Sequence, residues 1–337
     1  MTCSGAMTRS AVWGIRFSNG DSRRADRSDG VMKRLALVAT VVLMLGLVYW
    51  IGFRPGLLIV RTNASGVTVL VDGTPYGETT IDGLAVEVSR GAHFLRLERE
   101  GFESIEESIL VQGDSVVVVR MLAPLGMVFI EGGTFTMGDD DGAYSERPAH
   151  RVTLRPYFMD RTEVSMADYR RFRTRYTPPF DGDGLPATNV TWADATAFCR
   201  RQGKRLPTEA EWERACRGSD DRVYANGHRY DSTVARVGKG LYAGPVVVDE
   251  HPPGPEGIYH LTGNVWEWCS DWYDRGAYRN GDRDNPSGPR EGTRRALRGG
   301  AWYSNERYAR CTHRPGNFRA SKDPSFGFRC AKDTFIE

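Results

Sequence analysis

The sequence predicts an α+β protein in three parts: an apolar segment near the N-terminus, a small all-β module, and a larger irregular domain. Residues 35–53 carry no charge, short alternating strands fill residues 57–122, and three capped helices lie among aromatic and glycine-rich loops in residues 126–333. The 337 residues suffice for two domains. A formal net charge of +2 gives no reason to expect a nucleic-acid partner.

The apolar segment 35–53 is about long enough to cross a membrane as one transmembrane helix. Lys33 and Arg34 precede it, so the positive-inside rule places residues 1–34, a tail without a predicted fold, in the cytoplasm. We therefore expect a single-pass membrane protein whose later domains lie in the periplasm or outside the cell. A cleaved signal peptide is the alternative, but no small-x-small cleavage site follows the segment. The sequence leaves open whether Met1 or a residue near Met32 is the true start.

Residues 57–122 have the alternation of short β-strands. The predicted strands lie near residues 67–71, 86–88, 94–98, 105–111 and 116–119. Gly91, Gly101 and Gly113 separate several of them. The run Val71–Gly77 and the later Gly-x-His and Glu-Gly-Phe phrases resemble the PEGA domain. One departure is Glu-Thr-Thr after Gly77, where that family usually has Thr-Pro. PEGA modules are surface-associated spacers or binding modules, so the resemblance implies no chemistry.

Three helices of the larger domain are predicted from their N-caps. Ser165 precedes the first, and the pairs Thr191-x-x-Asp194 and Thr208-x-x-Glu211 form capping boxes for the next two. Gly203 and Gly218 are expected to end the second and third helices.

The larger domain also contains a set of fixed phrases. They are Gly132-Gly133-Thr134-Phe135-x-Met137-Gly138, Glu146-Arg147-Pro148-x-His150, Glu163-Val164, Val190-Thr191-Trp192, Gly203 to Glu213, Gly263-Asn264-Val265-Trp266-Glu267-Trp268, Arg298-Gly299-Gly300 and Gly327-Phe328-Arg329. Together they resemble the formylglycine-generating enzyme (sulfatase-modifying factor) family over about residues 126–333. The resemblance implies a compact variant of the C-type-lectin-like fold.

Active enzymes of that family oxidise a sulfatase cysteine to formylglycine and hold Cu(I) between two thiolates shortly after the Arg-Gly-Gly turn. Soft monovalent copper needs soft sulfur ligands. Here Ser304 occupies the position of the first copper cysteine, and the shorter segment that would carry the second contains none. Ala301 replaces a family serine. We therefore do not expect copper, and we interpret the domain as non-catalytic.

The family resemblance also accounts for most cysteines. It implies two disulfides, Cys199–Cys330 and Cys216–Cys311, in an oxidising compartment. Cys3 lies in the predicted tail. Cys269 is then the odd cysteine, and we expect a buried, inert thiol.

Calcium is the metal that the resemblance leaves open. One family calcium site would use the carbonyls of Gly263 and Val265 and the carboxylate of Glu267. The remaining side-chain position is His260, and imidazole is a poor ligand for a hard cation. The sequence therefore predicts at most a weak calcium site.

Two functions compete. The first is a non-catalytic binding or scaffold protein of the cell envelope, anchored by its helix, whose ligand is an unknown envelope protein, peptide or glycan. Its binding groove would be formed by Arg298, Trp302, Ser304, Arg307 and Arg310. Arginines of this C-terminal run can also brace internal carboxylates, so both roles stay open.

The alternative is an oxidoreductase or protein-modifying enzyme of the same family that uses non-haem iron or another metal. Iron would require a cluster of histidine and carboxylate ligands. The histidines are scattered without ligand spacing, and His260 with Glu267 is the only pairing of note. We expect His150 to have a structural role.

Overall fold

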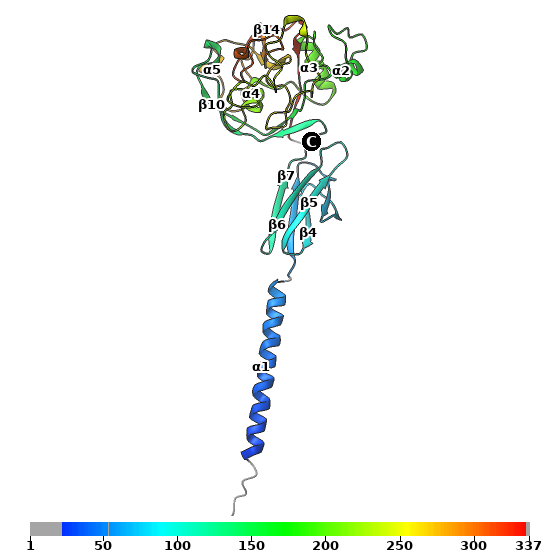
Figure 1. The fold of residues 1–337 in the computed structure, drawn as a ribbon, viewed down its shortest axis with the longest axis vertical. Coiled ribbons are helices and arrows are strands. Elements are labelled where there is room, and N and C mark those ends of the chain that lie inside the picture. The colour runs from blue at the N-terminus through cyan, green and yellow to red at the C-terminus, as the bar shows by residue number, and fades with distance from the viewer. Residues whose placement is uncertain (1–21, 53, 335–337) are drawn as a thin grey trace, which may run out of the picture. The chain divides into compact units, whose positions relative to one another are not determined.

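The structure, a computed structural model, describes residues 22–52 and 54–334, and the side chains of helix residues 22–31, 48 and 50–52 are not described (Figure 1). Cys3 and residues 1–21 of the predicted tail lie outside these ranges.

The first element is helix α1, Ser22–Gly52, of 31 residues. No helix in the described part of the chain combines the length and the apolar character that a membrane crossing requires. The prediction of a single-pass membrane protein, with a cytoplasmic N-terminus and later domains outside, is therefore wrong. The predicted tail also differs, because residues 22–34 lie within α1.

The small β-module consists of seven strands in two sheets, with strand orders β4-β1-β7 and β3-β2-β5-β6. The strands are β1 (Gly56–Thr62), β2 (Thr68–Val71), β3 (Thr74–Glu78), β4 (Leu84–Val88), β5 (Gly91–Glu98), β6 (Ile105–Val111) and β7 (Ser115–Arg120). Five of them match predicted strands, whereas β1 and β3 were not predicted.

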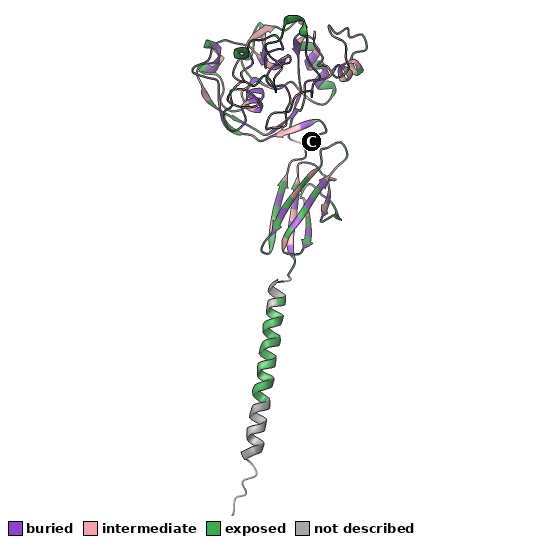
Figure 2. Ribbon diagram, in the orientation of Figure 1, coloured by how far each residue is buried: buried purple, intermediate pink, exposed green. Residues whose placement is uncertain are grey.

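The alternation within these strands sorts side chains between the core and solvent. β2 pairs with β5 in antiparallel register, with Val69 opposite Leu97 and Val71 opposite Leu95. All four side chains are buried, while residues between them are partly or fully exposed (Figure 2). The turn from β2 into β3 has positive φ at both Asp72 and Gly73, as a tight hairpin requires.

The large domain is mixed α/β, with short strands and short helices. Its strands are β8 (Met127–Ile130), β9 (Gly133–Met137), β10 (His150–Leu154), β11 (Tyr157–Asp160), β12 (Trp266–Trp272), β13 (Arg294–Arg298), β14 (Gly316–Phe318), β15 (Phe326–Gly327) and β16 (Ala331–Asp333). They form the sheets β10-β9, β16-β11-β8 and β14-β13-β12-β15. Because β8 and β16 both flank β11, the first and last strands of the domain lie in one sheet.

The helices are α2 (Met166–Phe172), α3 (Trp192–Arg201), α4 (Glu209–Arg217) and α5 (Ala277–Asn280), with 3-10 turns η1 (Tyr144–Glu146), η2 (Leu241–Ala243) and η3 (Glu306–Tyr308). Three helices, α2, α3 and α4, begin at the predicted caps, whereas α5 and the 3-10 turns were not predicted. In both α3 and α4 the threonine side chain accepts from the third helical backbone N–H, and the acid at that position accepts from the threonine N–H. Gly218 caps α4 with a positive φ of 63°.

Two of the apolar clusters inside the large domain each contain one disulfide. One cluster includes Trp212 and the Cys216–Cys311 disulfide. The other includes Trp268 and the Cys199–Cys330 disulfide. The pairings are those that the family resemblance implies, and they tie α4 and α3 to segments about a hundred residues later in the chain.

Candidate functional site

The loop after β13 carries Ala301 and Ser304, which the family resemblance assigns to the positions of the copper site. Ser304 is buried, and its Oγ accepts a hydrogen bond of 2.9 Å from the backbone N–H of Ala301. The Ser304 N–H in turn donates to the Ala301 carbonyl at 2.9 Å. The hydroxyl is thus a turn-forming oxygen and a hard ligand, so this position does not fit Cu(I).

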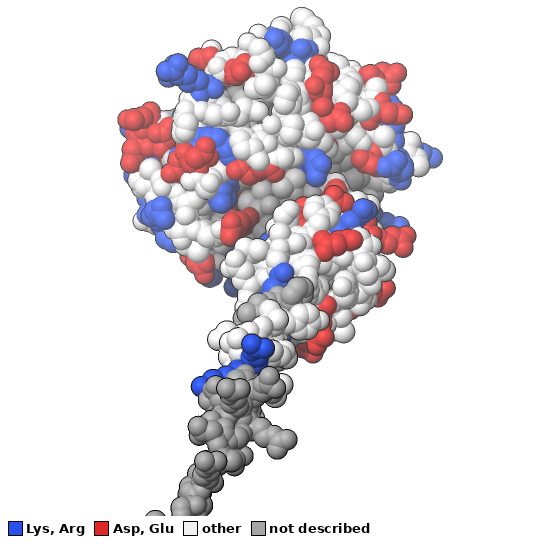
Figure 3. Space-filling model, turned by 60° about the horizontal axis from the view of Figure 1, so that its bottom comes forward, with Lys and Arg blue, Asp and Glu red and all other residues white. Residues whose placement is uncertain are grey.

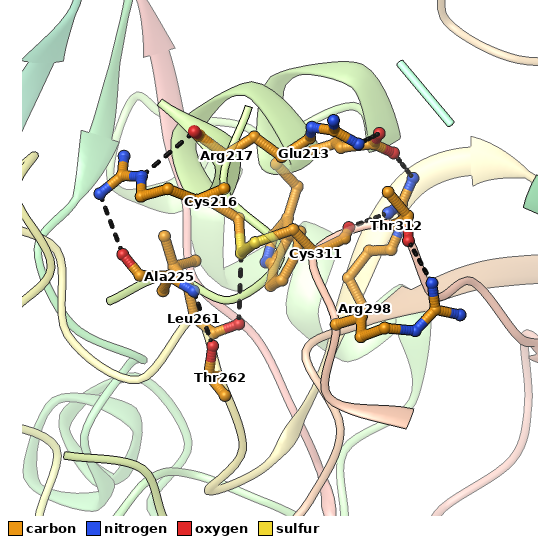
Figure 4. Close-up of a disulfide and its surroundings, with 12 residues drawn as sticks. Glu213, Cys216, Arg217, Ala225, Leu261, Thr262, Arg298, Cys311 and Thr312 are labelled. Carbon is orange, nitrogen blue, oxygen red and sulfur yellow. Dashed lines mark hydrogen bonds and ion pairs between the residues drawn. A yellow bond between two sulfur atoms is a disulfide. The ribbon is translucent and has the colours of Figure 1, made fainter. Parts of the chain in front are cut away.

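The nearest cysteine in the sequence, Cys311, is joined to Cys216 of α4 (Figure 4). A disulfide sulfur is not a thiolate, so this pair does not replace the missing copper ligands. The free cysteine, Cys269, is fully buried in the same apolar cluster. Burial, together with the negative charge of Glu209, raises the pKa of its thiol well above the ordinary value. Cys269 therefore has the properties of an inert core thiol.

Arg298 of the predicted groove lies inside the domain. It is fully buried, its Nε donates to Glu209 at 3.0 Å and its Nη2 to Glu213 at 2.9 Å. Its Nη1 donates to the Cys311 carbonyl at 2.7 Å (Figure 4). The prediction of Arg298 as a groove residue is wrong, because helix α4 supplies two carboxylates that hold the guanidinium in the core.

Arg310 is also held by carboxylates of its own domain. Its Nη1 donates to Asp139 and its Nη2 to Glu146, each at 2.9 Å. Burial alone would raise the pKa of Glu146, but the hydrogen bond from His313 and the charge of Arg310 outweigh it and lower the pKa to about 2. Arg307, by contrast, is exposed. Of the predicted groove arginines, only Arg307 is free to meet a ligand from solvent.

An aromatic surface lies around the Ser304 turn instead of an arginine-lined groove. We define it as the exposed rings of Tyr303, which precedes the 3-10 turn η3 in the chain, of Tyr308, which ends that turn, and of Tyr242, which follows Leu241. The ring centroid of Trp302 lies 5.3 Å from that of Tyr303 and 5.4 Å from that of Phe180, and the indole Nε1 donates to the carbonyl of Leu241. Sequence reasoning found Trp302 but missed the tyrosines, whose shared exposure depends on the loop conformation.

On the face drawn in Figure 3, acidic and basic side chains are interspersed, without a large area of one sign. Recognition by that face would therefore depend on local contacts more than on a long-range field.

The residues of the predicted calcium site do not fit calcium. Both carboxylate oxygens of the buried Glu267 accept from Arg329, at 2.7 Å each, and one also accepts from Trp212 Nε1 at 2.8 Å. A carboxylate occupied by N–H donors and neutralised by a guanidinium is a poor partner for Ca²⁺. At His260, Nε2 donates to the Val247 carbonyl at 3.2 Å, so this side chain supplies no oxygen ligand.

The structure does not gather the histidines into a metal site. His150 packs against Tyr278, His260 against His251, and His313 against Glu146, Trp266 and Tyr308. Within residues 22–52 and 54–334, no group of three or more His, Cys, Asp or Glu side chains is placed to hold a metal ion.

His260 gives a prediction for the pH dependence of stability. Burial, then the charge of His251, lowers its pKa from 6.5 to about 3 in the folded protein. The unfolded chain therefore binds an extra proton between these values, and folding stability falls as pH decreases from about 6.5 towards 3. The expected contribution is about 1.4 kcal/mol per pH unit in that window.

We expect His260→Asn to remove this dependence, because asparagine does not titrate and tolerates the positive φ of 53° at this position. Urea unfolding measures how far the free energy of unfolding decreases between pH 6.5 and pH 5. This decrease should be about 2 kcal/mol smaller in the variant than in the parent protein. His228→Asn, at an exposed position, is the matched control and should behave like the parent. Equal pH dependence in parent and His260→Asn would contradict the assignment.

Comparisons with known proteins agree with this architecture. The profile of the sulfatase-modifying factor enzyme 1-like domain matches residues 120–334, and that of the PEGA domain matches residues 56–122. The variable protein 1 of Treponema denticola shares the fold at a TM-score of 0.58 and 24% identity, over 61% of this chain and 94% of that one. PvdO from Pseudomonas aeruginosa shares the fold at a TM-score of 0.54 and 23% identity, again over 61% of this chain and 94% of that one.

Three curated relatives have informative names. The serine/threonine-protein kinase pkn1 of Chlamydia pneumoniae is 32% identical over 79% of this chain, which spans only 48% of that relative's length. The formylglycine-generating enzyme of Mus musculus is 32% identical over 64% of this chain and 77% of its own. The inactive C-alpha-formylglycine-generating enzyme 2 of Bos taurus is 30% identical over 61% of this chain and 88% of its own length. The chain thus belongs to the family of the sulfatase-modifying factor enzyme 1-like domain and carries a PEGA domain before it.

Proposed function

We propose that the large domain is a non-catalytic member of its family and that it binds a polypeptide through the aromatic surface. The observation that carries the proposal is Ser304, an oxygen held by Ala301 N–H at the position where the enzymes need a copper thiolate. Cys311, the nearest cysteine in the sequence, is bound in a disulfide. A domain that keeps the fold but lacks both sulfur ligands retains only its capacity to bind.

The exposed side chains around the turn suit a protein ligand. Tyr303 and Tyr308 are 37% and 52% exposed, and the ring of Tyr303 packs against the buried Trp302 and that of Tyr308 against His313. Tyrosine is enriched at protein interfaces because its ring buries much apolar area while its hydroxyl remains able to form hydrogen bonds. The accompanying PEGA domain supports a binding role, and one relative carries a name that describes it as an inactive enzyme.

The absence of the enzymatic reaction can be tested directly. The full chain would be incubated with copper and a cysteine-containing sulfatase-type peptide, and formylglycine would be measured by mass spectrometry. We expect no product, because no thiolate pair can hold Cu(I). A formylglycine-generating relative assayed in parallel is the positive control. Formylglycine above the background would overturn the proposal, and stoichiometric iron in the purified chain would favour an oxidoreductase instead.

Binding can be tested with peptides selected against the full chain from a displayed library. The double substitution Tyr303→Ala and Tyr308→Ala should weaken a selected peptide by at least about tenfold, as expected when central aromatic contacts are lost. Tyr144→Ala is the matched control, because Tyr144 is also exposed but packs against Arg275 and Arg279 elsewhere. Equal weakening by both substitutions, or binding to glycans alone, would contradict the proposed surface.

A further inference from the structure

A cavity of about 560 Å³ lies in the large domain, at a place to which the family resemblance assigns no role. Its lining includes His150, Glu209, Asp271, Tyr278, Gly288 and Arg314. None of the residues of the aromatic surface line it, so it is a separate feature. Met137, Ala210 and Ala277 add an apolar wall.

The buried carboxylate of Asp271 is left with one open oxygen. Its Oδ2 accepts from the backbone N–H of Glu209 and the hydroxyl of Ser270, both at 3.0 Å, and the residue is only 3% exposed. No donor in the described part of the chain reaches Oδ1. A side chain at Gly288 would bring its Cβ within 3.1 Å of that oxygen, so the glycine keeps the space beside Oδ1 free.

His150 adds a second acceptor to the cavity. Its Nδ1 lies 2.8 Å from the carbonyl of Pro148, and since a carbonyl can only accept, Nδ1 carries the proton. Burial lowers the pKa of His150, which keeps the ring neutral. Its Nε2 is then an unprotonated acceptor on a residue that lines the cavity.

The buried cation in the lining is already paired. Arg314 donates through Nε and Nη2 to the carboxylate of Glu209, and through Nη1 to the carbonyls of Ser145 and Asp274. Arg279 and Arg290 also line the cavity, at exposed positions. Among the less exposed polar groups, Asp271 and His150 offer open acceptors, while the buried guanidinium of Arg314 is used internally. A ligand that donates hydrogen bonds and carries positive charge matches this chemistry, whereas an anion does not.

We propose that this cavity binds a guanidinium or primary ammonium group, with Asp271 Oδ1 as its principal acceptor. The apolar wall accommodates the short aliphatic stem that carries such a group. Burial and the negative charge of Glu209 raise the pKa of Asp271 to about 7, and a bound cation offsets both effects by stabilising the ionised carboxylate. The same group occurs on small amines and at the ends of Arg and Lys side chains.

Isothermal titration calorimetry of the full chain with agmatine and with acetyl-Gly-Arg-Gly-amide distinguishes these two sources. Binding of agmatine alone indicates a small-molecule site, and binding of the peptide indicates recognition of a protein side chain. In either case Asp271→Asn should weaken binding by at least about tenfold, because a charged hydrogen bond is replaced by a neutral one. Asp282→Asn, at an exposed acid of the same cavity, is the matched control and should change affinity less than about twofold.

A second variant covers the case in which Asp271→Asn does not fold. Ala277→Leu fills part of the cavity from the partly exposed helix α5 and should abolish binding of whichever probe the parent protein binds. Absence of binding by both probes, unchanged affinity in Asp271→Asn, or tighter binding of inorganic phosphate than of agmatine would overturn the proposal.

Discussion

Replacing Glu209 with glutamine should lower the free energy of unfolding of the large domain by about 3–5 kcal/mol. Glu209 is the first residue of α4 and is 3% exposed. It accepts from Arg298 Nε at 3.0 Å and from Arg314 Nε at 2.9 Å, and both arginines are buried as well. Burial alone would raise the pKa of Glu209, but the charges of Arg314 and Arg298 outweigh it and lower the pKa.

The large effect has a specific cause. Glutamine keeps the size of the side chain but removes the negative charge, and two buried guanidinium groups then lose their shared counter-ion. Chemical denaturation at pH 7, with the disulfides intact, measures the loss. Glu250→Gln, at an exposed position, is the matched control and should change stability by less than about 0.5 kcal/mol. A loss below about 1 kcal/mol in Glu209→Gln would show that the network does not stabilise the domain as described.

Removing either disulfide should cost about 4 kcal/mol. The bridges Cys199–Cys330 and Cys216–Cys311 span sequence separations of 131 and 95 residues. Cross-links over such long loops restrict the unfolded chain strongly, and the cost depends only on the logarithm of loop length. The two double substitutions to serine should therefore destabilise the domain by similar amounts, in spite of the different spans.

Cys269→Ser is the control for this experiment, because it removes a buried thiol without removing a cross-link. Its expected effect is smaller, about 1–2 kcal/mol, for a small polar substitution in the core. Thermal unfolding with and without reductant provides a second measurement, in which the fully reduced parent protein, which lacks both bridges, should unfold at a lower temperature than either double variant under oxidising conditions. An unchanged midpoint on full reduction would contradict the role assigned to the bridges.

Local patterns of the sequence predicted much of the secondary structure. The three helix starts at Ser165, Thr191 and Thr208 are confirmed, because a capping hydrogen bond depends on residues only three positions apart. The strand β6 has the predicted bounds, Ile105–Val111. The strands β1 and β3 were missed, since β1 follows directly on the apolar segment and β3 lies next to a glycine turn.

The functional residues were harder to predict than the fold. Apolar content suggested a membrane-spanning segment at residues 35–53, whereas no described helix satisfies that criterion. The family resemblance suggested a groove with Arg298 and Arg310, whereas carboxylates of α4 hold Arg298 in the core and Glu146 of the 3-10 turn η1 pairs with the partly exposed Arg310. Sequence spacing does not reveal which charges meet across a hundred residues of chain.

The sequence by itself determined the family, the two modules and the helix caps, because each depends on residue identity or on neighbours close in the chain. Only the tertiary structure decided the roles of the charged residues. It buried Arg298 and Glu209 together, exposed Tyr303 and Tyr308 around Ser304, and opened a cavity beside Asp271. The physical reason is that burial sets the cost of an unpaired charge, and burial is a property of the packed chain.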